Sequence, residues 1–280
     1  MTNQIQKTNN KITFSAFMTS TGITNKINQI IGDDKSGKRF ISSIISAVSN
    51  NPMLQDCDNA SILSGALLGE SLNLSPSPQL GNYYLVPFKD KEKGMVATFQ
   101  LGYKGYIQLA IRSGQYKKLN VLAIKEGELI KYDPLNEEIE VKLIENEIER
   151  ENAKTIGYYA MFEYTNGFRK SLYWSKEKME AHALKYSNGY RADKQKKTAY
   201  TFWSKDFDGM AYKTMLRQLI SKWGIMSIEM QNAYEGDMAY IKEDGTKEYV
   251  DNEEYTPTVE AKEVEVKEET PKEAKKLSEI

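Results

Sequence analysis

The sequence of 280 residues is poor in the side chains that build metal and nucleophilic sites, with one cysteine, Cys57, and one histidine, His182. A structural zinc site draws its four ligands mainly from cysteine and histidine, and a disulfide needs two cysteines. A Ser-His-Asp relay would have to use His182. A single thiol is typical of a reducing compartment, and the chain has neither an apolar leader nor a run of ~18 apolar residues. The sequence therefore predicts a soluble cytoplasmic protein without a triad or a zinc centre.

The net charge of −1 conceals a strong asymmetry along the chain. Residues 241–280 contain 7 Lys and 13 Asp or Glu, so the rest of the chain is basic. Within that rest, residues 131–151 contain 3 basic and 8 acidic residues, whereas residues 166–224 contain 13 basic and 5 acidic ones. A charge run usually marks a solvated surface, but a basic segment interleaved with aromatic residues is typical of nucleic-acid binding.

Both ends of the chain are too polar to form a core. Residues 1–25 are rich in Asn and Thr, and the last forty residues are half charged, with few aromatic side chains. Such segments bury too little apolar surface to offset the entropy lost on ordering. We predict a flexible polar arm at 1–25, a single folded domain at 26–240 and a disordered acidic tail at 241–280.

Hydrophobic periodicity in the central part changes from helix to strand and back to helix. Apolar residues recur at helix spacing over 40–48, and a second helix is expected from Asn59 with Asp58 as N-cap. Strands are expected at 83–86, 95–99, 119–124, 129–132, 139–143, 156–164 and 168–174, and further helices at 103–112, 175–186 and 208–223. The strongest hairpin signal is the Asn166-Gly167 turn. The fold class is therefore α+β, a mostly antiparallel sheet flanked by helices, after a helical first third.

Residues 32–39, GDDKSGKR, nearly match the phosphate-binding loop of ATPases. Arg39 stands where that loop needs a hydroxyl for magnesium, and the apolar residues before it have helix spacing, whereas a phosphate-binding loop follows a strand. We interpret the segment as a turn between helices.

Four carboxylates, Glu177, Glu180, Asp206 and Asp208, could form the metal cluster of a nuclease. Each pair lies near the expected start of a helix, where a carboxylate stabilises the helix dipole without any metal. His182 lies on the apolar stripe of its helix, so we interpret it as a packed histidine rather than a catalytic base. The sequence therefore predicts no catalytic residue and no metal ligand.

Basic residues that stand close to aromatic ones carry the functional signal. Lys213 and Arg217 are four residues apart and share one face of the last expected helix. A basic loop that contains Arg191 leads into an aromatic segment with Phe202 and Lys205. Tyr103, Lys104, Arg112 and Lys117 form a second group of the same composition. Cations bind phosphates and aromatic rings stack on unpaired bases, so this mixture favours single-stranded nucleic acid over duplex.

Several blocks of residues match one known family. The longest, Phe99 to Gly114, reads FQLGYKGYIQLAIRSG, and the others include LNLSP at 72–76, NYYLVPF at 82–88 and DGMAYKTMLR at 208–217. In this order they resemble the RecT family of phage and prophage single-strand annealing proteins, over about residues 40–230.

The resemblance implies a DNA-annealing protein without bond chemistry, and so not an enzyme, that needs neither ATP nor another cofactor. Such a recombinase binds single-stranded DNA and pairs complementary strands within an oligomeric ring or filament. Its partners would be single-stranded DNA, the annealed duplex, further copies of the chain, a 5′–3′ exonuclease and a host single-strand binding protein, with no membrane. Together, residues and resemblance give these candidate DNA-binding residues: Tyr103, Lys104, Arg112, Lys117, Arg169, Arg191, Phe202, Lys205, Lys213 and Arg217.

Two alternatives stay open from the sequence. A phage assembly or scaffold protein that binds nucleic acid non-specifically would have the same charge pattern, and a metal-dependent nuclease would use Asp206 and Asp208. The helical first third is the expected contact between protomers. The acidic tail is expected to compete for the DNA groove, to bind a partner protein or only to keep the chain in solution.

Overall fold

The computed structural model describes residues 12–249, except positions 91 and 243. The first part of the chain is helical, with α1 (Phe14–Met18), α2 (Thr21–Ile31), α3 (Asp34–Ser49), α4 (Pro52–Gln55) and α5 (Asn59–Ser71). Asp58 caps α5 by accepting a hydrogen bond from the backbone N–H of Ser61 at 2.8 Å. The predicted helical first third and this N-cap are therefore confirmed.

The segment that resembles a phosphate-binding loop is a turn between two helices, as predicted. Gly32 follows α2 in the left-handed region with a φ of 96°, a conformation that favours glycine. Asp33 then caps α3 by accepting a hydrogen bond from the N–H of Ser36. No strand precedes the turn within the described residues, so its backbone lacks the geometry of a nucleotide-binding loop.

The strands are β1 (Tyr83–Asp90), β2 (Gly94–Leu101), β3 (Tyr116–Lys125), β4 (Leu129–Asp133), β5 (Glu138–Val141), β6 (Thr155–Tyr164), β7 (Arg169–Ser175), β8 (Ala239–Ile241) and β9 (Lys247–Tyr249). Every pairing between them is antiparallel. The described strands form three sheets, in the orders β1-β2-β8-β9, β3-β6-β7 and β4-β5. The antiparallel α+β class is confirmed. The strands are divided among separate sheets, however, and the alternation of apolar and polar residues within a strand does not indicate to which sheet it belongs.

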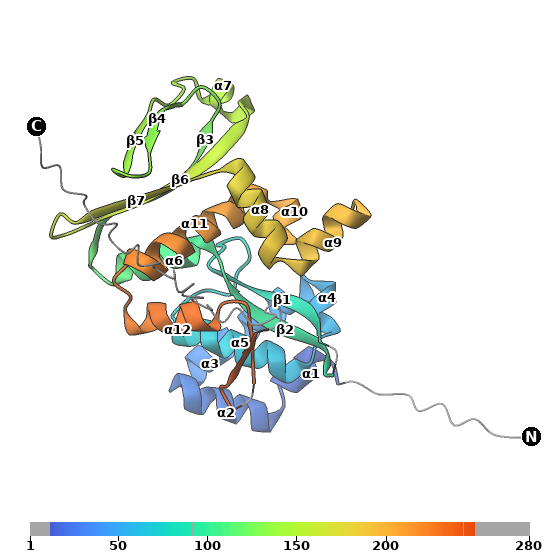
Figure 1. Ribbon diagram of the computed structural model, residues 1–280. Coiled ribbons are helices and arrows are strands. Elements are labelled where there is room, and N and C mark those ends of the chain that lie inside the picture. The colour runs from blue at the N-terminus through green and yellow to red at the C-terminus, as the bar shows by residue number, and fades with distance from the viewer. Residues whose placement is uncertain (1–11, 91, 243, 250–280) are drawn as a thin grey trace, which may run out of the picture.

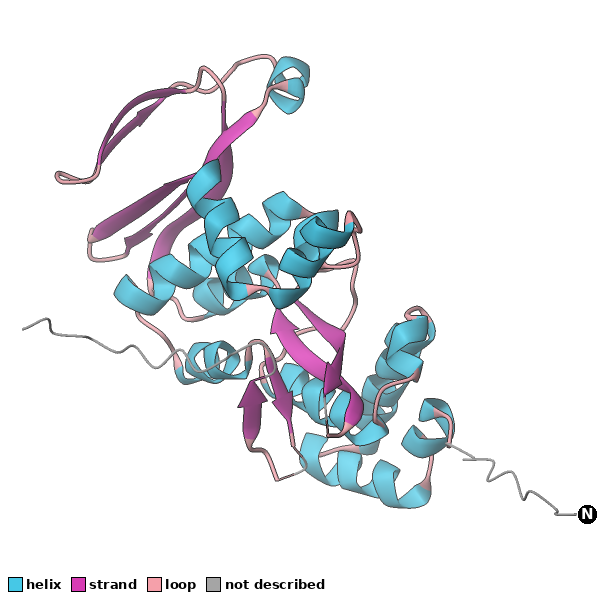
Figure 2. Ribbon diagram, turned by 45° about the vertical axis from the view of Figure 1, so that its right-hand side comes forward, coloured by secondary structure: helices cyan, strands magenta, loops and turns pink. Residues whose placement is uncertain are grey.

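The other helices are α6 (Tyr103–Arg112), α7 (Glu147–Asn152), α8 (Lys176–Tyr186), α9 (Asn188–Lys196), α10 (Phe202–Lys205), α11 (Phe207–Trp223) and α12 (Ile228–Gly236). Helices lie between the two larger sheets (Figure 2). Helix α11 contributes Leu216 and Ile220 to a core shared with the first five helices, β1 and β2. It contributes Met215 and Leu219 to a second core beneath β6 and α8. This helix therefore joins the two halves of the molecule (Figure 1).

The folded part of the chain extends further at both ends than the sequence predicted. Phe14 and Met18, within the predicted flexible arm, are buried in the first core, because a five-residue helix is too short to show a clear period in sequence. Ile241 is also buried, and β9 extends to Tyr249, so the start of the predicted acidic tail belongs to a sheet. The remainder of the predicted arm, 1–11, and of the tail, 250–280, lies outside the described residues.

Candidate nucleic-acid interface

The start of α6 is held very close to the chain that precedes β1. The N–H of Gly102 donates to the carbonyl of Asn82 at 2.8 Å. A Cβ at residue 102 would lie 2.1 Å from the carbonyl oxygen of Gly81, and one at Gly105 would lie 2.1 Å from that of Asn82. Only glycine permits this approach, so the glycines of the LGYKGY block fix where the side chains of residues 103 and 104 emerge.

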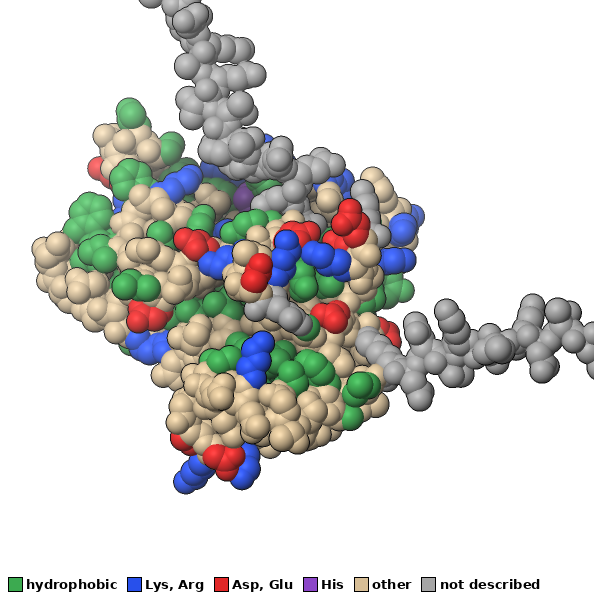
Figure 3. Space-filling model, turned by 90° about the horizontal axis from the view of Figure 1, so that it is seen from below, with side chains coloured by type: hydrophobic (Ala, Val, Ile, Leu, Met, Phe, Trp, Pro, Cys, Tyr) green, Lys and Arg blue, Asp and Glu red, His purple; other side chains and the backbone are tan. Residues whose placement is uncertain are grey.

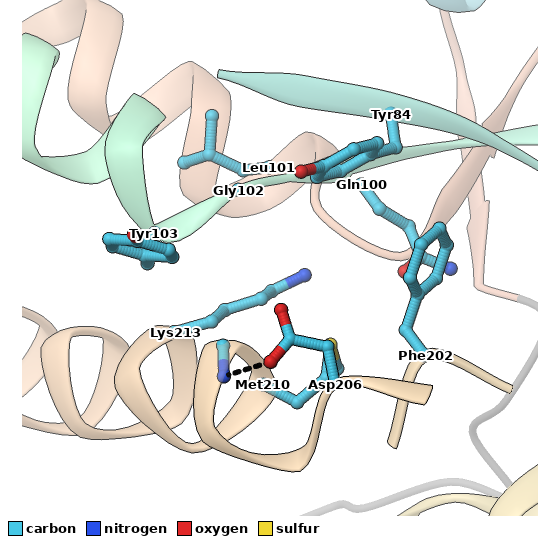
Figure 4. Close-up of a pocket in the computed structure, with 10 residues that line it drawn as sticks. Tyr84, Gln100, Leu101, Gly102, Tyr103, Phe202, Asp206, Met210 and Lys213 are labelled. Carbon is cyan, nitrogen blue, oxygen red and sulfur yellow. Dashed lines mark hydrogen bonds between the residues drawn. The ribbon is translucent and has the colours of Figure 1, made fainter. Parts of the chain in front are cut away.

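The side chain of Tyr103 borders a narrow space that we call the aromatic cleft. It is lined by Tyr84, Gln100, Leu101, Gly102, Tyr103, Phe202, Asp206, Gly209, Met210 and Lys213. One wall comes from β1, β2 and the start of α6, and the other from α10 and α11 (Figure 4). The ring centroids of Tyr84 and Phe202 are 5.2 Å apart, and those of Tyr103 and Tyr212 are 5.6 Å apart. Segments about a hundred residues apart thus meet through aromatic contacts.

Two exposed lysines accompany the cleft. The side chains of Lys104 and Tyr84 both approach Gly81, and Lys205 lies one turn after Phe202 on α10. Phe202 is 39% exposed, whereas its neighbour Trp203 is buried. The free volume of the cleft is only about 50 Å³. A base can therefore stack on the open side of Phe202 but does not fit inside the cleft.

The acidic residue of the cleft, Asp206, serves the local fold. It caps α11 by accepting a hydrogen bond from the N–H of Gly209 at 2.9 Å, as the sequence predicted for a carboxylate at a helix start. Burial, and secondarily this carboxylate, raise the pKa of Tyr84. Tyr84 is therefore a neutral phenol near pH 7 and adds no negative charge to the cleft.

Lys213 and Arg217, predicted as ligands of DNA phosphates, are paired with a buried acid of the fold. Lys213 is only 6% exposed, and its Nζ donates to Oδ1 of Asp237 at 2.8 Å. Arg217 donates to Oδ2 of the same carboxylate at 2.5 Å, and its guanidinium stacks on the Tyr234 ring. The prediction missed this because Asp237 lies beyond the helix in sequence. Trp223, the last residue of this helix, is 51% exposed.

None of the four remaining basic candidates lines the aromatic cleft. Arg112 donates to the carbonyls of Leu72 and Asn73 at the end of α5. Lys117 forms an ion pair with Glu163 at 2.6 Å. Arg169 begins β7 and lies 3.4 Å from the hydroxyl of Tyr159, and Arg191 hydrogen-bonds Asn188. Arg191 lies on helix α9, not on the loop that the sequence indicated.

Asp193 holds the segment that carries Phe202, and sequence reasoning missed it. This buried carboxylate accepts hydrogen bonds from the hydroxyls of Thr198, Thr201 and Ser204. It also accepts from the backbone N–H groups of residues 200 and 201. These donors lower its pKa below the usual range, with the Thr198 hydroxyl contributing most. The signal in the sequence was the run of hydroxyl residues after an acid.

The residues weighed for bond chemistry have structural partners. His182 packs between Trp174 and Tyr186, and burial lowers its pKa to about 4. Asp208 accepts a hydrogen bond from the hydroxyl of Tyr158 at 2.6 Å. Among residues 12–249, apart from 91 and 243, no three His, Cys, Asp or Glu side chains gather in a group that could hold a metal ion.

The face of the molecule shown in Figure 3 is not uniformly basic. On the face in Figure 3, basic side chains lie among acidic and apolar ones, and much of the surface has other side chains or backbone. No helix in the described part of the chain is long and apolar enough to cross a membrane.

Residues 38–257 match the sequence model of the RecT family. The chain belongs to this family. It is 41% identical over 239 residues to the uncharacterized protein YqaK of Bacillus subtilis (strain 168), and the aligned region covers 85% of this chain and 75% of YqaK. It is 30% identical over 203 residues to the protein RecT of Escherichia coli (strain K12), 71% of each chain. The resemblance seen in the sequence is thus confirmed, and membership of the RecT family supports a role in single-strand annealing and recombination.

The RecT match contains every element that lines the aromatic cleft, from β1 to α11. The first two helices precede it, although Phe14, Met18 and Ile27 are buried in the same core as α3.

Proposed function

We propose that this protein binds single-stranded DNA and anneals complementary strands without ATP or bond chemistry. Its membership of the RecT family carries the proposal. The exposed cations and the open aromatic ring beside the cleft support it, because phosphates and unpaired bases need these two kinds of partner. Two complementary strands repel each other through their phosphates, and cations that replace the counterions reduce this barrier while base edges stay free to pair.

The proposed contacts follow from exposure. Lys104 and Lys205 bind phosphates, and Phe202 offers its open side to a base. Tyr103 and Tyr84 hold the walls of the cleft in place. Arg169, exposed at the turn between β6 and β7, is proposed as a more distant phosphate ligand. Lys213 and Arg217 are assigned to the fold, and their contribution to binding is indirect.

The wider arrangement is also part of the proposal. Protomers join head to tail into a ring or filament, so that their clefts follow one strand. Exposed apolar residues in the helical first part, Ile12, Ile30 and Met53, are candidates for that contact. A 5′–3′ exonuclease would supply single strands in the bacterial cytoplasm, and a host single-strand binding protein would be the competitor or partner there.

The test is the rate at which two complementary fluorescent oligonucleotides pair in the presence of the purified protein, without ATP and with a chelator. Acceleration that falls as salt rises supports the proposal. Tight binding of both strands without acceleration would leave a scaffold protein that coats nucleic acid. Degradation of the strands only when magnesium is added would identify a nuclease instead.

A further inference from the structure

A second open space lies at the other end of α11, and we call it the hairpin groove. It is bounded by the β4–β5 hairpin, by β7 and by the last turns of α11, and it has a volume of about 250 Å³. Its lining includes Tyr132, Glu137, Lys170, Gln218, Lys222 and Trp223. At ~30 Å³ per water this is space for about eight water molecules, and therefore for one pyrimidine ring. The hairpin projects beside β6 and β7 in Figure 1.

Trp223 is the unusual residue of this groove. It is 51% exposed, whereas the two other tryptophans, Trp174 and Trp203, are 9% and 8% exposed. Its backbone is fixed, because its carbonyl accepts a hydrogen bond from the hydroxyl of Tyr164 at 3.1 Å. Nζ of Lys170 lies 3.7 Å from the centre of its ring. An exposed indole with a cation against it is a partner for a planar, anionic ligand such as a nucleotide.

Lys170 has a second partner that belongs to the hairpin. The side chain of Lys170 is only 12% exposed, and it forms an ion pair with Glu137. Glu137 has a φ of 58°, in the left-handed region that few non-glycine residues adopt. The hydroxyl of Tyr132 also contacts the carbonyl of Tyr173, at 3.4 Å. These contacts hold the hairpin against β7. The carboxylate of Glu137 is paired with Lys170, the cation that a phosphate would bind.

We propose that the hairpin groove binds one nucleotide of single-stranded DNA, with the base stacked on Trp223 and a phosphate replacing Glu137 at Lys170. Lys222, exposed at the rim, is the second cation. This inference rests on the proposed function and deepens it. Met210 of the aromatic cleft and Lys222 of the groove are twelve residues apart on α11, about 18 Å along the axis. At 3.6 residues per turn the two residues are also about 120° apart around the helix, so the cleft and the groove lie on different faces of α11.

The first experiment follows the fluorescence of Trp223 directly. Wild type is titrated with an oligothymidine strand and with an abasic strand of equal length, which has the same phosphates but no bases. The thymine strand should quench the emission and the abasic strand should not. Trp223→Phe should lose this quenching while its affinity stays near that of wild type, because phenylalanine still stacks. Trp223→Ala should weaken binding by about fivefold or more.

The second experiment tests the competing carboxylate with a matched control. Glu137→Gln frees Lys170 and should strengthen binding of the thymine strand about two- to fivefold at low salt, the worth of one ion pair at the surface. Glu138→Gln, at the adjacent residue, removes the partner of Lys131 instead and should leave affinity unchanged. Equal affinities for Glu137→Gln and wild type would refute the competition.

The two proposals fail in different ways. A protein that binds and anneals strands, but shows no base-dependent quenching and no effect of Trp223→Ala, would overturn the groove while leaving the annealing function intact. A protein that binds neither strand would overturn the proposed function itself.

Discussion

Nζ of Lys213 and Oδ1 of Asp237 are 2.8 Å apart, and both side chains are buried. The same carboxylate accepts hydrogen bonds from Arg217, from the hydroxyl of Tyr106 and from the backbone N–H of Leu101. One acid thus joins α11, α6 and β2 to the chain that follows α12. Because two cations share this carboxylate, the site carries an excess positive charge, and burial lowers the pKa of Lys213.

Removing this carboxylate should destabilise the fold strongly. Asp237→Ala leaves Lys213 and Arg217 without their anion in a buried site, and we expect the free energy of unfolding to fall by about 3–5 kcal/mol in urea titrations. Glu235→Ala is the control, because that residue forms an ion pair at the surface with Lys247, and it should cost less than about 1 kcal/mol. Equal losses for both variants would contradict the buried network.

Salt dependence should separate the lysines that bind DNA from those that hold the fold. Lys104→Ala and Lys205→Ala should each reduce the slope of log affinity against log salt by about 0.7, the value for one phosphate contact on a single strand. Lys213→Met should lower stability without changing that slope. Lys38→Ala, on α3 and 70% exposed beside Asp34, should change neither. A reduced salt slope for Lys213→Met would instead show that Lys213 binds a DNA phosphate.

The single histidine should make stability fall in mild acid. The pKa of His182 is about 4 in the folded protein and about 6.5 in the unfolded chain. Between these two pH values the unfolded chain binds a proton at this residue and the folded protein does not. Stability contributed by the neutral imidazole is complete above pH 6.5 and declines towards pH 4, by at most about 1.4 kcal/mol per pH unit. His182→Gln should show a shallower decline in urea titrations between pH 7 and 5. If wild type and His182→Gln lost stability in parallel, the pKa of His182 would not be lowered by folding.

Asp193 should control the order of the segment that leads to Phe202. Asp193→Ala leaves three hydroxyls and two backbone N–H groups without their acceptor, so we expect a lower melting temperature and faster proteolysis between α9 and α11. The stabilisation by this carboxylate is complete above its unfolded pKa of about 3.9 and is lost as the pH falls below that value. Asp244→Ala removes an exposed acceptor in the β8–β9 turn and should leave that proteolysis unchanged.

Local structure was the most predictable part of the fold, because its causes lie within a few residues of each other. The N-cap Asp58, the hairpin at Gly167 and the bounds of α6 at 103–112 agree with the structure. Helix α9 was missed because its sequence, NGYRADKQK, has little apolar periodicity. That helix is held from outside by Asp193 and by the packing of Tyr190 on Trp203.

The sequence by itself determined the family and the local elements. The glycines of the LGYKGY block, for example, are needed because α6 starts so close to residues 81 and 82. The sequence also determined that the chain has basic segments beside aromatic ones. Only the tertiary structure decided which cations are available to a ligand. Lys213 and Lys104 look equivalent in sequence, but one is buried against Asp237 and the other is exposed beside Tyr84. The free energy of a charge depends on burial and on partners brought from distant parts of the chain, and these are properties of the packed molecule.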